Sequence, residues 1–174
     1  MKTIAKILFA PVLICLLSFS FYFSTWKIDK NYIIAFDTKG ASGTIAGLSG
    51  VVNFSPNTLN SSKIDVSVDV NTLDAGLSLK SKHAKNDGFL NAEKYPKITF
   101  KSSSFVKSGD SYLVRGDLTI KATTKRVEIP FTFVDKGQSG EFNGQFQINR
   151  TDYNLEKWGI GEVLDIDIKL PVSK

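Results

Sequence analysis

Few side chains in this sequence could carry out covalent or metal chemistry. The 174 residues include one histidine, His83, and one cysteine, Cys15. Nucleophilic catalysis needs a serine, cysteine or similar group beside a base, and no Gly-x-Ser-x-Gly motif is present to hold a serine nucleophile. A typical zinc site needs several cysteine and histidine ligands, and a calcium loop needs clustered acids. The residues therefore predict no catalytic set, no metal and no cofactor.

Two pairs of carboxylates remain as candidates for acid and base chemistry. Asp65 and Asp69 alternate with valines, and Asp165 and Asp167 alternate with isoleucines. Alternation of this kind places polar residues on the water-exposed face of a strand rather than in a cleft. Solubility and protection of sheet edges are the expected roles of these four residues.

The first 24 residues differ from the rest of the chain in composition. Lys2 and Lys6 precede an uncharged apolar run over residues 7–23. This layout is typical of a secretory signal peptide, which predicts a periplasmic or secreted protein. The run is slightly shorter than a membrane span and contains Pro11, so an uncleaved inner-membrane anchor formed by residues 7–23 is the alternative.

The remaining residues, 25–174, contain no cysteine, and their length suits one domain with its own core. The whole chain carries 22 Lys and Arg residues against 17 Asp and Glu residues, with both signs spread along it. That balance is too mild to indicate nucleic acid. It is compatible with transient contact with an anionic membrane surface, and the oligomeric state, monomer or homodimer, is left open.

From Trp26 onward, apolar and polar residues alternate in the pattern of strands with one buried face. Ile64, Val66, Val68 and Val70 are the clearest example. Clusters of Ser, Gly, Asn and Asp separate the runs and favour turns. The pattern predicts eight strands, at residues 31–38, 43–54, 62–71, 96–106, 111–121, 124–134, 140–150 and 162–172.

Eight strands with one apolar face fit either a closed barrel or a two-layer sandwich. Short connections favour antiparallel neighbours in an up-and-down order, and closure removes exposed edges. We therefore predict an all-β fold, an eight-stranded antiparallel up-and-down barrel over residues 25–174. A barrel of this size is either filled by its own side chains or holds one small ligand, and the nine phenylalanines of residues 25–174, out of thirteen in the chain, suit both cases.

Two segments interrupt the strand pattern. Residues 72–95, between the third and fourth predicted strands, include His83 and the pair Phe89-Leu90 and predict a crossover with a short helix. Residues 151–161 include Trp158. Long loops with aromatic residues often cover an opening, so both segments are candidates for the rim of a barrel.

The chain resembles the YceI-like family at residues 93–102, which read EKYPKITFKS, and at residues 116–121, which read GDLTIK. The resemblance extends over residues 25–172. Members of this family are exported bacterial proteins with a lipocalin-like barrel, and some hold a polyisoprenoid chain such as a quinone tail. The resemblance implies an exported, non-catalytic protein that binds an isoprenoid lipid. The alternative is an envelope stress or interaction protein whose barrel is filled by side chains.

If the interior is a tunnel, its aromatic and aliphatic residues would contact the lipid chain, and the two long segments would contact its head group. The predicted ligand-binding residues are Phe36, Val66, Val68, His83, Phe89, Leu90, Tyr95, Phe100, Tyr112, Phe131, Phe133, Phe146 and Trp158.

The crossover departs from the family pattern beside its histidine. His83 is kept, but Lys80-Ser81 stands where the family usually carries Arg-Asp. A lysine cannot reproduce the bidentate grip of a guanidinium on a carboxylate. His83 itself has two interpretations, a solvated or structural loop residue and a polar contact for a ligand head group, and the sequence leaves both open.

Overall fold

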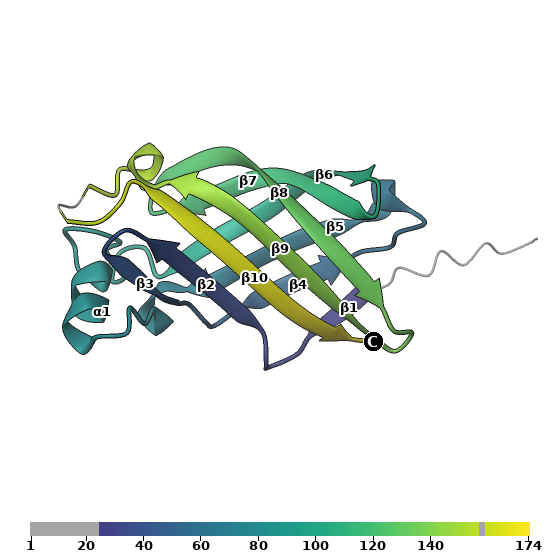
Figure 1. Ribbon diagram of the computed structural model, residues 1–174, viewed down its shortest axis with the longest axis horizontal. Helices are drawn as coiled ribbons and strands as arrows, with labels where there is room; N and C mark the ends of the chain where they lie inside the picture. The colour runs from purple at the N-terminus through teal and green to yellow at the C-terminus, as the bar shows by residue number, and fades with distance from the viewer. Residues whose placement is uncertain (1–24, 157–158) are drawn as a thin grey trace, which may run out of the picture.

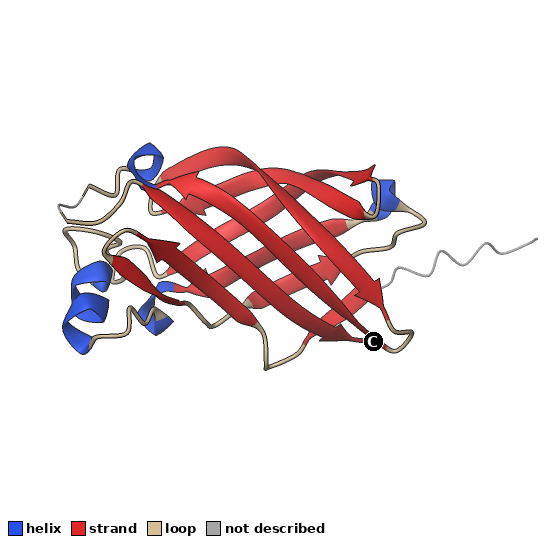
Figure 2. Cartoon of the chain, viewed as in Figure 1, coloured by secondary structure: helices blue, strands red, loops and turns tan. Residues whose placement is uncertain are grey.

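The computed structural model describes residues 25–156 and 159–174, which form an antiparallel β-barrel with one short α-helix (Figures 1 and 2). The predicted signal segment and Trp158 lie outside the described residues. Ten strand segments make up the sheet: β1 (Thr25–Ile28), β2 (Ile33–Thr38), β3 (Ala41–Thr44), β4 (Ser49–Asn53), β5 (Lys63–Asp69), β6 (Lys97–Ser108), β7 (Ser111–Ile120), β8 (Thr123–Asp135), β9 (Ser139–Asn149) and β10 (Val163–Ser173).

The ten segments occupy eight positions around the barrel, because β1 and β2 share one position and β3 and β4 share the next. β10 pairs with β2 near the middle of its length and with β1 at its end. β4 pairs with β1, and β3 pairs with β2. All neighbours are antiparallel, and the β1–β10 pairing closes the ring. The prediction of a closed, eight-stranded up-and-down barrel is confirmed.

Interruptions in the first two positions are the main correction to the predicted strands. The first position begins at Thr25 rather than residue 31 and breaks between β1 and β2. The predicted strand 43–54 breaks between β3 and β4, and residues 45–48 are not in a strand. A hydrogen bond connects the two interruptions: the Leu48 N–H donates to the Tyr32 hydroxyl at 2.8 Å.

The crossover between β5 and β6 carries the predicted helix, α1 (Ser78–Lys85), after a 3-10 turn (Val70–Thr72). The crossover also completes the ring beside β3, where Thr44 and Asp74 exchange two backbone hydrogen bonds of 2.9 Å. Gly43 allows this close approach, because a Cβ atom there would lie 1.9 Å from the Asp74 carbonyl oxygen. Two further 3-10 turns are Leu59–Ser61 and Arg150–Tyr153.

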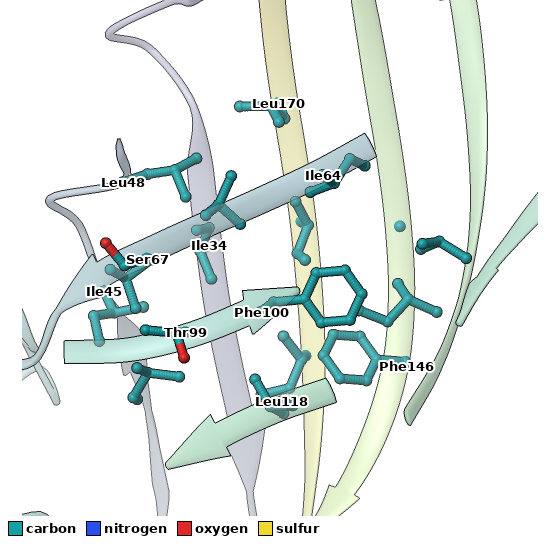
Figure 3. Close-up of a pocket in the computed structure, with 18 of the residues that line it drawn as sticks. Ile34, Ile45, Leu48, Ile64, Ser67, Thr99, Phe100, Leu118, Phe146 and Leu170 are labelled. Atoms are coloured by element: carbon teal, nitrogen blue, oxygen red, sulfur yellow. The ribbon is translucent and has the colours of Figure 1, made fainter. Parts of the chain in front are cut away.

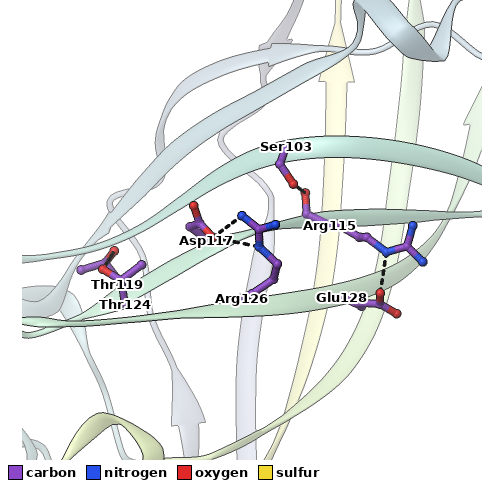
Figure 4. A network of polar contacts seen from close by, with 7 residues as sticks. All are labelled: Ser103, Arg115, Asp117, Thr119, Thr124, Arg126 and Glu128. Carbon is purple, nitrogen blue, oxygen red and sulfur yellow. Dashed lines mark hydrogen bonds and ion pairs between the residues drawn. The ribbon is translucent and has the colours of Figure 1, made fainter.

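Period-two alternation determines which side chains line the interior. Along β7, Tyr112, Val114, Gly116, Leu118 and Ile120 are buried, and the residues that alternate with them are more exposed. The outward residues of β7 and β8 form cross-strand pairs instead, including Arg115 with Glu128, Asp117 with Arg126, and Thr119 with Thr124 (Figure 4). Pairs of this kind stabilise a sheet surface modestly.

Aromatic residues fill one end of the barrel. The Phe54 ring lies at the centre, with five ring centroids 5.1–5.8 Å from its own. Those five rings belong to Phe105, Tyr112, Phe131, Phe133 and Phe142. We call Phe54 and these five residues the aromatic plug. It lies near the β6–β7 and β8–β9 hairpins, at the opposite end of the barrel from α1 (Figure 1).

Over residues 25–156 and 159–174, the structure contains no helix with the length and apolar character needed to cross a membrane.

Candidate functional site

The barrel interior is hollow between the aromatic plug and α1. Two adjoining cavities occupy this space, a deep chamber of about 220 Å³ next to the plug and a mouth chamber of about 330 Å³ next to α1. The residues that line both cavities are all isoleucines. We call this set the isoleucine collar: Ile34, Ile45, Ile98, Ile120, Ile148 and Ile166. The shared lining makes the two chambers parts of one channel along the barrel axis.

The deep chamber is almost entirely apolar. Phe100 from β6 and Phe146 from β9 contribute rings to it, and Leu118 from β7 lies close to them (Figure 3). Among the described residues that line it, only Ser67 and Thr99 have polar side chains. A buried polar group without a partner is unfavourable, so this chamber suits a hydrocarbon and opposes a polar or charged ligand group.

Three separate segments build the mouth chamber. The β2–β3 hairpin contributes Phe36 and Thr38, the crossover contributes Phe89 and Leu90, and the loop before β10 contributes Leu155. The same chamber is lined by Lys80 and His83 of α1, and no carboxylate lies among its described lining residues. Polar ligand groups that accept hydrogen bonds would therefore meet donors at this end of the channel.

Lys80 connects two walls of the mouth chamber. Its Nζ donates to the Gly40 carbonyl oxygen at 3.2 Å, which links α1 to the β2–β3 turn. Ser81, the next residue, is buried, and its Oγ accepts from the Ala75 N–H at 2.9 Å and lies 3.2 Å from Asp74 Oδ1. The Lys80-Ser81 pair thus has a local structural role. Lys80 connects α1 to the β2–β3 turn, and Ser81 connects α1 to the crossover residues that precede it.

Arg150 holds the loop before β10, the third segment that builds the mouth chamber. This residue was not among the site residues predicted from the sequence. Its side chain is only 6% exposed, yet its guanidinium donates to the Gly161 carbonyl at 2.9 Å and to the carbonyls of Leu155 and Ile160. A planar guanidinium can satisfy several carbonyls of one loop at once. The available signal was a charged residue directly after the alternating strand β9, where the loop begins.

Nine of the predicted ligand-binding residues line the channel. Phe36, His83, Phe89 and Leu90 line the mouth chamber. The residues that line the deep chamber are Val66, Val68, Phe100, Phe131 and Phe146. The structure therefore brings together residues from five strands and the crossover, and their contact with a ligand remains a prediction.

Three predicted residues line neither chamber. Tyr112 stacks on Phe131 with ring centroids 5.4 Å apart, and Phe133 packs 4.4 Å from Phe142, so both belong to the aromatic plug. Tyr95 lies at the end of the crossover, just before β6, and Lys94 Nζ sits 5.4 Å from its ring centroid. The plug residues point inward as expected, but neighbouring rings occupy the space that a ligand would need.

The fold and site define a class of protein: a small closed barrel, sealed at one end by aromatic rings, with an apolar channel that meets polar groups at the other end. A barrel of this size can be filled by its own side chains or can hold one small ligand, and here part of the interior is open. No group of three His, Cys, Asp or Glu side chains suited to a metal ion occurs within the described residues.

The YceI-like domain model matches residues 26–172, and the chain belongs to this family. A UPF0312 protein of Vibrio campbellii is 30% identical over 163 residues, which cover 80% of this chain and 85% of the relative.

Two solved structures share the fold. Burkholderia cenocepacia BcnA superposes with a TM-score of 0.79 at 24% identity, covering 83% of this chain and 99% of that one. A polyisoprenoid binding domain from Saccharophagus degradans, implicated in plant cell wall breakdown, gives a TM-score of 0.67 at 13% identity, covering 87% and 98%.

Proposed function

We propose that this protein is a non-catalytic carrier that holds the long apolar chain of an isoprenoid lipid in its barrel. The observation that carries the proposal is the channel itself, in which a deep apolar chamber continues through the isoleucine collar into a chamber with donors at its rim. The deep chamber would hold the end of the chain, and the mouth chamber would hold the head group.

The chemistry of the lining supports a hydrocarbon ligand. Each Å² of apolar ligand surface removed from water contributes roughly 25 cal/mol, so a long chain needs few polar contacts. Branched isoleucine side chains offer an irregular apolar wall, and a methyl-branched chain presents a matching irregular surface. The Saccharophagus degradans neighbour, a polyisoprenoid binding domain, has the same barrel and supports the choice of an isoprenoid over other lipids.

We further propose that the protein is exported, with residues 1–24 as a signal peptide. The composition of that segment supports the proposal, and an anchor formed by residues 7–23 is the alternative outcome. Measuring the mass of the protein recovered from the cell envelope tests it, because removal of the segment would lower the mass by that of about 24 residues.

A filled barrel that acts as an interaction protein is the competing function. The aromatic plug favours this view for one end of the barrel, but the two chambers at the other end oppose it. The two functions differ in a measurable way, because only the carrier is stabilised by a lipid that enters the channel.

Thermal unfolding in the presence of a polyprenol tests the carrier function. A ligand that binds only the folded state raises stability by about 2.7 kcal/mol at a hundredfold excess over Kd. We expect Tm to rise with polyprenol concentration in the natural protein and not in Ile166→Phe, which enlarges a collar residue. Ile33→Phe is the matched control, because Ile33 is 50% exposed on the neighbouring strand. An unchanged Tm in the natural protein would contradict the proposal.

A further inference from the structure

Two leucines at the start of α1 are exposed to solvent. Leu77 is 62% exposed and Leu79 is 65% exposed, and these are the largest values among the exposed large apolar residues of the described chain. Exposed apolar residues that cluster and are surrounded by polar groups often mark an interaction site.

Lysines surround this pair. The helix α1 carries Lys80, Lys82 and Lys85 and no acidic residue. Over residues 77–97 there are five lysines against two carboxylates, Asp87 and Glu93. The surface therefore combines apolar side chains with an excess of positive charge, and we call Leu77, Leu79, Lys80 and Lys82 the entrance patch.

The entrance patch lies at the open end of the channel. Lys80, His83 and Ala84 of α1 line the mouth chamber. Leu79 lies one helical turn before His83, and residues four apart share a helix face, so Leu79 is next to the α1 residues that line that chamber. Figure 2 shows α1 at the end of the barrel opposite the β6–β7 and β8–β9 hairpins.

We propose that the entrance patch docks on the surface of an anionic lipid bilayer, which places the mouth chamber against the source of its ligand. This inference rests on the proposed carrier function. Leucines can enter the boundary between head groups and acyl chains, and lysines are attracted to negatively charged head groups. An isoprenoid chain could then pass from the bilayer to the channel with little exposure to water.

A bilayer fits this patch better than a second copy of the chain. Two copies that met through this patch would bring their lysines together, and like charges across an interface oppose association. An anionic bilayer supplies the opposite charge and an apolar layer beneath it, so it matches both components of the patch.

Sedimentation with lipid vesicles tests the inference on the protein as exported by its own cells. We expect it to bind vesicles of phosphatidylcholine with phosphatidylglycerol and not vesicles of phosphatidylcholine alone. Binding should weaken several-fold in Leu77→Gln/Leu79→Gln, and by about tenfold or more in Lys80→Gln/Lys82→Gln at low salt. The second variant should also show a weaker dependence on salt.

Matched controls come from the opposite end of the barrel. Val106 and Val134 are 41% and 49% exposed there, and Lys107 and Lys136 are their cationic neighbours. Val106→Gln/Val134→Gln and Lys107→Gln/Lys136→Gln should bind vesicles as the natural protein does. Equal losses at both ends, or unchanged binding in both entrance variants, would overturn the inference.

Polyprenol-dependent thermal stabilisation, measured without vesicles, separates this inference from the carrier function. Variants that keep the stabilisation are folded and retain the channel. If the natural protein is stabilised by polyprenol but does not prefer anionic vesicles, docking is overturned and the carrier function stands. If polyprenol has no effect on the natural protein, the carrier function fails, and docking as a loading step fails with it.

Discussion

His83 faces the mouth chamber from α1, at the position expected for contact with a ligand head group. We predict that His83→Ala lowers the affinity for a quinone by about fivefold, because one hydrogen bond contributes roughly 1 kcal/mol. The affinity for an isoprenoid hydrocarbon without a polar head should stay the same. Calorimetric titration with both ligands tests this.

Lys85→Ala is the control for the His83 variant. Lys85 lies on the same helix, but its Nζ donates to the Asn71 carbonyl at 3.1 Å, and it lines neither chamber. Equal quinone affinity in His83→Ala and the natural protein would assign His83 to the solvated or structural role instead.

Tyr153 is the most deeply buried tyrosine of the described chain, and its surroundings perturb its pKa. Its ring is 2% exposed, and its hydroxyl has no hydrogen-bond partner among the described residues. Burial, with the nearby charge of Asp152, raises the pKa of Tyr153 to about 12. The neutral phenol is therefore favoured in the folded state.

The raised pKa of Tyr153 predicts a loss of stability in alkali. An unfolded tyrosine ionises near pH 10 and the folded one near pH 12, so the unfolded state binds fewer protons between these values. The ionisation of Tyr153 should leave the free energy of unfolding unchanged below pH 10 and lower it by about 2 kcal/mol as the pH rises to 12. Urea unfolding at several pH values should show this alkaline loss in the natural protein and not in Tyr153→Phe. An identical alkaline slope in both would contradict the assignment.

The burial and the hydrogen-bond partners of Arg150 and Ser81 could not be predicted from the sequence. Each is buried, and each contacts groups brought close by the fold: carbonyls of the loop before β10 for Arg150, and the crossover backbone for Ser81. Composition predicts that arginine and serine are exposed. Only the path of the surrounding loops reveals their partners.

The strands differ in how well alternation predicts them. β7 and β9 alternate without interruption, and their predicted ranges agree closely with the structure. β1 is only four residues long, too short for a clear period. Between Lys27 and Ile33 the chain advances six residues while β10 advances four, from Ser173 to Lys169, so two extra residues separate β1 from β2.

The alternation of apolar and polar residues also does not predict which inward side chains form the plug and which line the channel. Phe100 and Phe133 both point inward, and nothing in the local sequence distinguishes their roles. Cross-strand register places Phe133 opposite Phe142 within the plug, whereas Phe100 lies opposite Val66 and Leu118 beside open space. Whether an inward phenylalanine fills the barrel or lines a cavity depends on its height along the axis.

This difference between the two phenylalanines predicts that a larger ring changes ligand affinity at Phe100 and stability at Phe133. Phe100→Trp should weaken polyprenol binding by tenfold or more, because the larger ring occupies the deep chamber, and should leave stability nearly unchanged. Phe133→Trp should lower the free energy of unfolding by about 1–3 kcal/mol through overpacking of the plug and leave affinity nearly unchanged. Fluorescence titration and urea unfolding measure both quantities. Equal losses of affinity would contradict the separation of plug from channel.

At the scale of the whole molecule, the barrel is a tube closed at one end. Rings that meet edge to face seal it beside the β6–β7 and β8–β9 hairpins, and the open end is bordered by α1, the β2–β3 turn and the loop that Arg150 orders. Under the proposed carrier function, a lipid would enter by this end with its chain first, and its head group would stay near the rim.

Native mass spectrometry of the protein taken from its own cell envelope tests the carrier function most directly. A carrier should show a second mass above that of the polypeptide, which extraction identifies as one isoprenoid lipid per chain, and Phe100→Trp should lose it. A single mass equal to that of the polypeptide alone, unchanged after incubation with polyprenols and quinones, would rule out the carrier function and favour the filled-barrel interaction protein.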